Sequence, residues 1–512
     1  MIKNFKWLLL FSLTLAACSS DDDVSVAPDS SDGQPLTAGT ADFSKYVALG
    51  DSFAAGFSDN ALFIKGQEGA YPNILAQQFS TVGGGTFTTP FTNDNIGGLL
   101  LGGNIITGPR LYFDTVTSTP LSVEGTPTTE VTAHLAGNFN NLGVPGAKSF
   151  HLLAPGYGNP SGILTGTANP YFARFASSAT TTVIADALSQ NPTFFSLWIG
   201  GNDELGYATA GGDPTVNPLT PAATFDAAYK ALIAQLAAGG RKGVIANLPV
   251  ITTLPHFHVI KYNQLTQQNL TINGTNLVNA LNAQLYGPLH NALTYLGQGD
   301  RIKLLSATGN NPMLMVDENL TDLSANLKSV LMMGGADEIT ATVLGQIFGK
   351  ARQTLPTDLI CLSASSRIGK SPSVAADGIA SPSETLGQLG ITFPLPDRYV
   401  LLPSEVAEIE IATNAYNVTI QAAAEANNLA LVDAKSIMEQ LNKPNGIVSD
   451  SYTLTSTFVT GGMFSLDGVH PSPRGYALIA NKFIEAINAK YGSNIKSVNL
   501  GNYPILFPKT LK

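Results

Sequence analysis

The sequence predicts an α/β fold with a mainly parallel sheet, on the basis of two observations. Short apolar runs bounded by turn residues recur along the chain, as expected for buried strands. Helical patterns lie between several of these runs, and alternation of strands and helices is typical of parallel α/β folds. The apolar runs cover residues 46–49, 194–199, 243–246, 302–305, 359–362, 399–402 and 429–432.

Two segments carry the clearest helical patterns. Residues 221–240 repeat apolar side chains at helical spacing and end in two glycines, which commonly stop a helix. Residues 472–492 begin with Ser472, a good N-cap residue, and Pro473, which fits the first turn of a helix. The expected buried stripes are Phe225, Ala228, Leu232 and Leu236 in the first helix and Tyr476, Ile479, Phe483 and Ile487 in the second.

The N-terminal 42 residues are predicted to lie outside the fold. Residues 1–17 begin with a basic segment and continue with an apolar stretch and small residues, as in a secretory signal peptide. The sequence Leu-Ala-Ala-Cys that ends at Cys18 resembles a bacterial lipobox, which implies cleavage before Cys18 and acylation of that cysteine. Residues 18–42 are rich in Ser, Asp, Gly and Pro and predict a flexible acidic tether.

These features predict a lipoprotein of the bacterial outer membrane that faces either the periplasm or the cell surface. Ser19, rather than an aspartate, follows Cys18, and in lipoproteins this favours passage to the outer membrane. The three aspartates at 21–23 resemble the acidic export signals of Bacteroidetes surface lipoproteins. A plain solvated linker is an equally good interpretation of that acidic run.

The charge and the cysteine count exclude several classes of function. The formal net charge is −10, and loss of residues 1–17 with Lys3 and Lys6 changes it to −12. A chain this acidic does not attract nucleic acid or anionic lipid. Besides Cys18 the chain contains only Cys361, so we expect neither an intramolecular disulfide nor a cysteine-ligated metal. Cys361 lies in an apolar run and is expected to be a packing residue.

The mature chain is too long for one simple core. After the tether, roughly 470 residues remain, which indicates either two domains or one domain with large insertions. We expect one domain over 43–495 and a C-terminal tail over 496–512. Within it, residues 81–140 and 151–180 are poor in helical patterns, and residues 252–400 interrupt the strand–helix alternation, so these three segments are predicted insertions.

Gly50, Asp51 and Ser52 directly follow the first apolar run. In parallel α/β sheets, chemistry gathers at the carboxyl ends of the strands, which makes Ser52 a candidate nucleophile and Asp51 a supporting residue of its turn. Gly-Asp-Ser is also ordinary turn sequence, so this stretch alone does not decide between the two interpretations. Ala54 stands where a Gly-x-Ser-x-Gly nucleophile elbow needs glycine, which disfavours the α/β-hydrolase fold.

A serine nucleophile needs a base, and the base needs an orienting group. His470 has a carboxylate at a useful local spacing, that of Asp467. Their loop can bring this carboxylate to Nδ1 of the ring and leave Nε2 free to accept a proton. His256 and His258 have no third ligand at metal-binding spacing, so no metal site is predicted. Structural roles are expected for His134, His151, His256, His258 and His290.

Two further polar turns complete the set of candidates. Asn202 and Asp203 follow the apolar run at 194–199, as Ser52 follows the first run. In a parallel sheet both turns open at the same edge, where the Asn202 amide can donate to an oxyanion and Asp203 can support it. An Asx turn is the alternative. Gly146, in the stretch at 140–149, can bring a backbone N–H close to a ligand, although glycine is also a common turn residue.

Taken in order, these four stretches resemble the sequence blocks of the SGNH/GDSL hydrolase family. The stretch GDSFAAG resembles block I, with Ser52 as its serine, and NLGVPGA resembles block II, with Gly146 as its glycine. The stretch IGGND resembles block III, with Asn202, and DGVHPS resembles block V, with Asp467 and His470. The order and the placement at strand ends make the combination specific.

The resemblance implies a flavodoxin-like three-layer α/β/α sandwich and hydrolysis of acyl esters without a metal or cofactor. Ser52 would be the nucleophile, His470 the base and Asp467 the residue that orients it. The backbone N–H groups of Ser52 and Gly146 and the side-chain amide of Asn202 would form the oxyanion hole. The expected partner is an acyl-ester substrate, either a lipid or an acetylated glycan.

The substrate remains open at this point. The resemblance covers roughly 43–250 and 398–490 in pieces, and the insertions between them weaken any inference from family substrates. A lipase or esterase is the first interpretation. A carbohydrate O-acetyl esterase is the alternative, and a catalytically inactive surface-binding lipoprotein is the third. The apolar residues of 323–348 predict either a lid over the substrate site or an insertion with its own small core.

Overall fold

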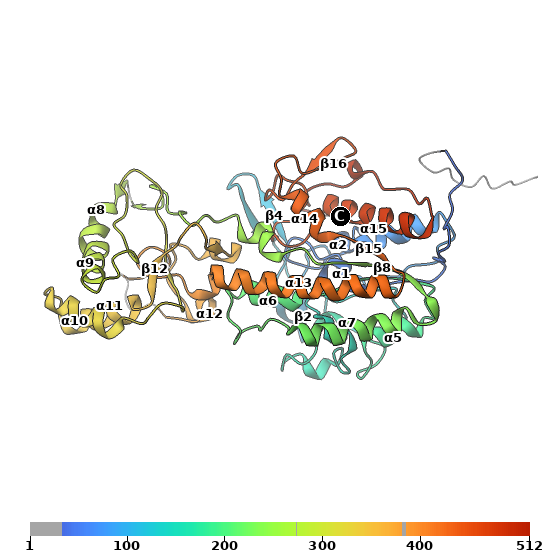
Figure 1. The fold of residues 1–512 in the computed structure, drawn as a ribbon, viewed down its shortest axis with the longest axis horizontal. Coiled ribbons are helices and arrows are strands. Elements are labelled where there is room, and N and C mark those ends of the chain that lie inside the picture. The colour runs from blue at the N-terminus through green and yellow to red at the C-terminus, as the bar shows by residue number, and fades with distance from the viewer. Residues whose placement is uncertain (1–32, 273, 381–385, 512) are drawn as a thin grey trace, which may run out of the picture.

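A five-stranded parallel sheet forms the centre of the protein (Figure 1). The computed structural model describes residues 33–272, 274–380 and 386–511. The strand order is β15-β8-β7-β1-β6, and every residue of β1 and β7 is buried, as expected for strands covered on both faces. The strands are β1 (Tyr46–Gly50), β6 (Asn141–Gly143), β7 (Phe194–Trp198), β8 (Lys242–Ala246) and β15 (Ala430–Val432).

Helices cover both faces of this sheet. On one face, α3 (Tyr71–Ser80) packs against α15 (Pro473–Tyr491). On the other face, α7 (Ala222–Leu236) packs against the long helix α13 (Pro403–Ala426), and α5 (Val183–Ser189) contacts β1. The predicted α/β/α sandwich with a parallel sheet is therefore confirmed.

Both helices predicted from sequence periodicity are present. The Ser472 hydroxyl accepts a hydrogen bond of 3.0 Å from the Gly475 N–H and so caps α15, as its sequence predicts. The expected stripes of α7 and α15 are buried in the main core. Aromatic stacking links the paired helices, with ring centroids 4.7 Å apart for Tyr71 and Phe483 and 4.2 Å apart for Phe225 and Tyr416.

Three of the predicted strands do not belong to the central sheet. Residues 302–305 form no strand. Two others form a small antiparallel pair, β13 (Leu359–Ile360) with β14 (Val400–Leu401), outside the sheet. The fifth strand of the sheet, β6, escaped prediction because its three residues Asn-Leu-Gly are too few to show a period and include two turn-forming types.

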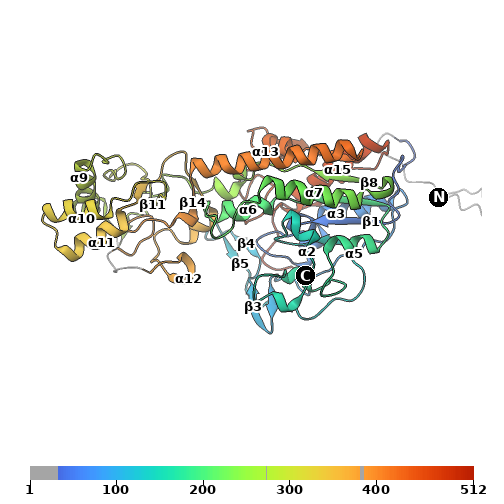
Figure 2. The ribbon, with the colours of Figure 1, turned by 60° about the horizontal axis from the view of Figure 1, so that its bottom comes forward.

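Residues 260–402 contain a second hydrophobic core, separate from the one around the sheet. Figures 1 and 2 show this part as a lobe at the end of the molecule, joined to the sheet domain beside the start of α13. Inside it, Arg352 pairs with Asp317 and Asp358, both at 2.6 Å. Its regular elements are β9 (Thr271–Ile272), β10 (Thr275–Asn276), α8 (Val278–Leu281), α9 (Gly287–Tyr295), β11 (Leu314–Val316), α10 (Ser324–Met333), α11 (Glu338–Phe348), β12 (Ala351–Gln353), β13, α12 (Val374–Asp377) and β14.

The apolar segment at 323–348 forms the helical hairpin α10–α11 in this second lobe. Leu327, Leu331 and Phe348 are buried in the core of the lobe. Both views place the hairpin at the end of the lobe away from the sheet. In this structure the segment is therefore part of an insertion with its own core and not a lid over the sheet edge.

Further short helices and strands of the sheet domain lie outside the central sheet. Residues 81–140 contain two antiparallel hairpins, and residues 151–180 contain mostly turns. Arg110 is fully buried and its guanidinium donates to the carbonyls of Pro508 and Lys509, which fastens the C-terminal tail to the domain. The remaining elements are α1 (Ser52–Ala55), α2 (Ile64–Glu68), β2 (Leu99–Leu101), β3 (Asn104–Thr107), β4 (Leu111–Asp114), β5 (Thr119–Ser122), α4 (Pro170–Ala173), α6 (Asn202–Thr209), α14 (Ala434–Leu441), β16 (Ile447–Ser449) and β17 (Tyr452–Leu454).

The predicted signal peptide at 1–17, Cys18 and most of the tether lie outside the described residues. Among the residues that are described, no helix has both the length and the hydropathy needed to cross a bilayer.

Candidate active site

Ser52 lies at the carboxyl end of the central strand β1. Asp51 caps the short helix α1 that follows, because its Oδ1 accepts a hydrogen bond of 3.0 Å from the Phe53 N–H. Burial raises the pKa of Asp51 to about 7, against the lowering effect of that hydrogen bond. Gly50 has no room for a side chain, since a Cβ would lie 2.6 Å from the Trp198 carbonyl oxygen. The turn therefore places Ser52 at the strand end with only 6% of its surface exposed.

Ser52, His470 and Asp467 form an unbroken chain of hydrogen bonds. The Ser52 Oγ lies 2.9 Å from His470 Nε2, and His470 Nδ1 lies 3.0 Å from Asp467 Oδ2. The fold thus joins a serine directly after β1 to a histidine 418 positions later, just before α15. This is the arrangement in which a carboxylate orients an imidazole and leaves its other nitrogen to accept the serine proton.

Backbone N–H groups hold the Asp467 carboxylate in place. Its Oδ1 accepts hydrogen bonds of 2.8 Å from the N–H groups of Val469 and His470, and its Oδ2 accepts one of 2.9 Å from Asn60. Burial alone would raise the pKa of Asp467, but the charge of His470 and these hydrogen bonds outweigh it and lower the pKa well below its ordinary value. Asp467 therefore remains a carboxylate at neutral pH.

The turn that supplies the Asn60 N–H was not identified from the sequence. Asp59 and Asn60 both have left-handed backbone angles, with φ of 50° and 65°, in a tight turn between Ser58 and Ala61. The Asp59 Oδ1 also accepts a hydrogen bond of 3.0 Å from the Leu466 N–H, so this turn holds the loop before His470 at two points. An adjacent Asp and Asn is the signal that could have indicated it, because these residues tolerate left-handed turns.

His256, expected to have a purely structural role, contacts the same loop. Its backbone N–H donates to the Gly468 carbonyl at 3.0 Å, and its ring Nδ1 lies 3.1 Å from the Asp467 carbonyl oxygen. Gly468 has φ of 72°, and a Cβ there would lie 2.9 Å from the His256 nitrogen. Burial lowers the pKa of His256, so the ring is neutral and serves as a packing and hydrogen-bonding support.

The loop after β6, which contains Gly146, is held by the first turn of α6. The Asn202 amide donates to the Ala147 carbonyl at 3.1 Å. The buried Asp203 carboxylate accepts hydrogen bonds of 2.8 Å from both the N–H and the hydroxyl of Ser149. Burial raises the pKa of Asp203, and the Ser149 hydrogen bonds oppose this shift. Gly146 has φ of 81°, which favours glycine. Asp203 thus supports the loop.

A cavity of about 840 Å³, including the part open to solvent, lies beside Ser52. Most of its lining is apolar, and Asn202 lines it together with Ser52, whereas Gly146 does not. The lining residues come from 51–53, 198–205, 248–254, 432–441 and 463–483, so the second lobe contributes none. An apolar cavity next to a nucleophilic serine suits the hydrocarbon part of a substrate.

Comparison with protein-family models found one family, described as GDSL-like lipase/acylhydrolase, which matches residues 46–299 and 292–483. The chain belongs to the GDSL-like lipase/acylhydrolase family. Comparison with curated proteins and with solved structures gave no match. Family membership makes this protein an ester hydrolase in the general sense, and it agrees with the parallel sheet flanked by helices.

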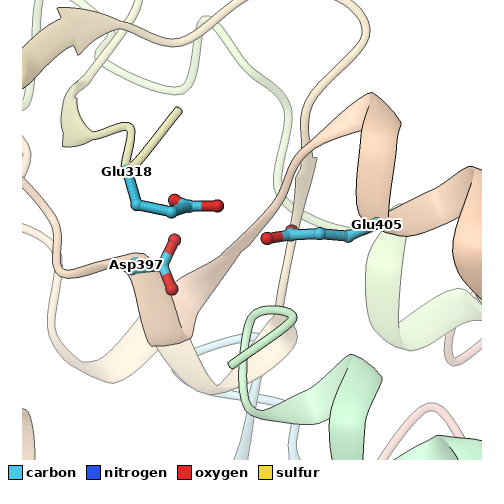
Figure 3. Close-up of side chains that lie close together, drawn as sticks. All are labelled: Glu318, Asp397 and Glu405. Atoms are coloured by element: carbon cyan, nitrogen blue, oxygen red, sulfur yellow. The ribbon is translucent and has the colours of Figure 1, made fainter. Parts of the chain in front are cut away.

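One cluster of acidic side chains in this GDSL-like acylhydrolase was not foreseen from the sequence. Glu318, Asp397 and Glu405 lie where the second lobe meets the start of α13, and Figure 3 shows their carboxyl groups turned toward one another. Carboxyl oxygens of the three lie within 4.8 Å of one another. That spacing would let them hold one cation, but it is also what carboxyl groups adopt when they share protons.

Burial and mutual repulsion disfavour three charged carboxylates in this acidic cluster. Burial and the neighbouring Glu318 carboxylate raise the pKa of Asp397. Burial also raises the pKa of Glu405, against a hydrogen bond of 2.7 Å from the Leu402 N–H, and Glu318 adds to the rise. Hydrogen bonds from Asp397 and Glu405 lower the pKa of Glu318, against its own burial. With no cation bound, these shifts favour protons on Asp397 and Glu405 and a charged Glu318 at neutral pH.

We expect the acidic cluster to make this GDSL-like acylhydrolase less stable as the pH rises. The unfolded chain releases these protons near pH 4, whereas the folded chain keeps them, so stability falls from about pH 4 up through the raised pKa values. Glu405→Gln, which retains the carbonyl oxygen that accepts from Leu402, should reduce this loss and raise the Tm by a few degrees at pH 8 to 9. Thermal unfolding from pH 5 to pH 9 measures it.

The matched control for this pH experiment is Glu410→Gln, an exposed glutamate on the same helix. Its unfolding curve should follow that of the unmodified protein across the pH range. If Glu405→Gln and the unmodified protein lose stability equally between pH 5 and pH 9, the three carboxyl groups do not share protons.

Proposed function

We propose that the protein hydrolyses carboxylic esters through an acyl intermediate on Ser52. The observation that carries this proposal is the hydrogen-bond chain from Ser52 through His470 to the ionised Asp467. Family membership supports ester hydrolysis in general, and the chain of hydrogen bonds supplies a nucleophile, a base and an orienting group.

In the first step, the Ser52 Oγ attacks the ester carbonyl carbon while its proton passes to His470 Nε2. The tetrahedral intermediate then collapses, the bond to the alcohol oxygen breaks, and His470 returns the proton to the departing alcohol. In the second step, His470 takes a proton from water, the resulting hydroxide attacks the acyl carbon, and Ser52 leaves with the proton as the free acid forms. Asp467 stays ionised and stabilises the imidazolium throughout.

Three N–H donors are suited to stabilise the oxyanion of each tetrahedral intermediate. Within the described residues, the backbone N–H groups of Ser52 and Gly146 donate no hydrogen bond and so remain available. The Asn202 amide uses one N–H on the Ala147 carbonyl, which orients the other. Donors held in place before the charge develops lower the barrier without reorganisation.

Replacement of Asn202 by alanine should therefore lower kcat by on the order of 10²–10³, with a smaller effect on KM. Steady-state kinetics on a soluble p-nitrophenyl ester measure both constants. The control is Asn427→Ala, at an exposed asparagine at the end of α13. Asn217 is unsuitable because it binds Lys148, which lies in the same loop as Gly146, and Asn73 in α3 is unsuitable because it bonds to buried groups. Equal kcat for Asn202→Ala and the control would exclude Asn202 as an oxyanion donor.

We further propose that the acyl part of the substrate is apolar and longer than acetyl. The apolar cavity beside Ser52 supports this choice over an acetylated sugar, which would need polar groups around its ring. The test combines a fluorophosphonate probe with a series of p-nitrophenyl esters. Labelling at Ser52 and a preference for longer acyl chains are expected. Activity confined to acetate would instead support an O-acetyl esterase, and absence of both labelling and hydrolysis would support a binding protein.

We also propose that the protein is an outer-membrane lipoprotein anchored through Cys18. The lipobox-like sequence before Cys18 supports the anchor. The Thr37 N–H donates to Asn494 Oδ1 at 2.7 Å and the Thr40 N–H to the Tyr491 carbonyl at 2.9 Å, so the chain enters the domain at the amino edge of the sheet, opposite Ser52. An anchor there would leave the cavity facing away from the membrane. Cys18→Ala should release the protein from the membrane fraction, and unchanged fractionation would contradict the anchor.

A further inference from the structure

The cavity beside Ser52 extends along the carboxyl edge of the sheet to its edge strand. Its lining includes Ser52 after β1, Trp198 at the end of β7, Leu248 after β8 and Val432 at the end of β15. These strands are consecutive neighbours in the sheet. Because neighbouring strands lie about 4.8 Å apart, the cavity covers about 14 Å of the sheet edge from the nucleophile outward.

Helix α14 supplies the wall of this cavity at the edge strand. Four residues of the helix line the cavity, at the spacing i, i+3, i+4 and i+7 that places side chains on one helical face: Ala434, Ile437, Met438 and Leu441. The opposite face, with Ser436, Glu439 and Gln440, is exposed. Met438 is 4% exposed and sits in the middle of the apolar face. The apolar side of α14 thus faces both the cavity beside Ser52 and the protein core.

The backbone of α14 is fixed at its first turn. The Asp433 carboxylate accepts hydrogen bonds from the N–H of Ser436 at 3.2 Å and from its hydroxyl at 2.5 Å. Asn247, directly after β8, donates to Asp433 at 2.8 Å and accepts from the Lys435 N–H at 3.0 Å. With the helix tied to the sheet in this way, the size of the cavity depends on the side chains that α14 presents.

Further apolar groups that line the cavity come from α15 and from the loop before His470. Ile479 and Phe483 of α15 and Met463 and Phe464 of the loop line it, and all four are almost fully buried. Most of the enclosure is therefore apolar, which suits a hydrocarbon chain better than a polar acyl group.

We propose that α14 determines the acyl-chain length of the substrate, with Met438 as the main specificity-determining residue; this rests on the proposed hydrolysis through Ser52. An extended hydrocarbon chain advances about 1.3 Å per carbon, because its C–C bonds of about 1.5 Å meet at tetrahedral angles. A cavity covering about 14 Å of sheet edge therefore accepts an acyl chain of about ten carbons. The substrate class is an ester of a medium-length straight-chain fatty acid.

Kinetics on p-nitrophenyl acetate, butyrate, octanoate, decanoate and hexadecanoate test this proposal. For the unmodified protein, kcat/KM should be highest near octanoate and decanoate. Met438→Trp fills part of the cavity, so that one or more methylene groups of a long acyl chain no longer fit. The kcat/KM for decanoate, divided by that for acetate, should therefore fall by at least about tenfold. Met438→Ala enlarges the cavity and should move the optimum toward hexadecanoate.

Glu439→Ala, the next residue on the exposed face of α14, is the matched control and should keep the chain-length profile of the unmodified protein. Two opposite shifts from one position are not expected from a general loss of stability, and remaining acetate hydrolysis shows that each variant is folded. If all variants share one profile, or if the unmodified protein prefers acetate, α14 does not set chain length. If the unmodified protein neither reacts with a fluorophosphonate at Ser52 nor hydrolyses any ester, the proposed function itself is wrong.

Discussion

Ser52→Ala should abolish ester hydrolysis, with kcat lower by on the order of 10⁴–10⁶. Alanine removes the only atom that forms the acyl bond, while the donors that stabilise the oxyanion and the substrate cavity remain. Because Ser52 is buried and its Oγ bonds only to His470 among the described residues, the variant should fold normally. Initial rates on p-nitrophenyl octanoate and the mass of the protein after reaction with a fluorophosphonate measure the effect.

The control for this variant is Ser80→Ala, which changes an exposed serine at the end of α3 and should keep full activity and labelling. The Ser52 variant should gain no mass from the probe. If Ser52→Ala retains even a tenth of the activity, the nucleophile lies elsewhere in the chain, and the short contact between Ser52 and His470 has another purpose.

Asp467→Asn should lower kcat by about 10³–10⁴ with little change in the fold. An asparagine carbonyl can still accept the N–H groups of Val469 and His470, which holds the loop. Its amide nitrogen would then face both the Asn60 N–H and His470 Nδ1 as a donor. The hydrogen bond from Asn60 is lost, and the proton of the neutral ring moves to Nε2. In that tautomer Nε2 cannot accept the Ser52 proton, and the imidazolium loses its countercharge.

Kinetics and thermal unfolding together measure the Asp467→Asn effect. Loss of the hydrogen bond from Asn60 should lower the Tm by no more than a few degrees, while kcat falls by orders of magnitude. Asp300→Asn, at an almost fully exposed aspartate that pairs with Lys303 on the surface of the second lobe, should change neither quantity. A kcat that drops only in proportion to a loss of folded protein would mean that Asp467 has a structural role alone.

Much of the fold could be predicted from the sequence because its elements have strong local signals. The buried runs that became β1, β7, β8 and β15 are mostly apolar, and Ser472 and the apolar stripe identified α15. β6 escaped notice because it has only three residues and pairs with β1 through backbone atoms that any residue provides. Ile302 and Leu305 are apolar for another reason, since they pack in the core of the second lobe.

The residues of the candidate site also divide into those with a local sequence signal and those without one. Ser52, Asn202 and the Asp467–His470 pair stand out in the sequence because polar residues follow buried strands or share a short loop. The left-handed turn at Asp59 and Asn60 and the contact from His256 were not identified, because each matters only through a backbone hydrogen bond to a loop about 200 to 400 positions away. Such a contact leaves no periodic pattern near either residue.

The sequence by itself determined the class of fold, the order of the four motifs and the residues proposed for the chemistry, since these depend on burial patterns and turn preferences within short segments. Only the tertiary structure decided that Ser52 and His470 lie 2.9 Å apart and that α10–α11 packs in a separate lobe. It also decided that four strand ends and α14 enclose one apolar cavity. These are distances between segments far apart in the chain, and packing of the whole domain sets them.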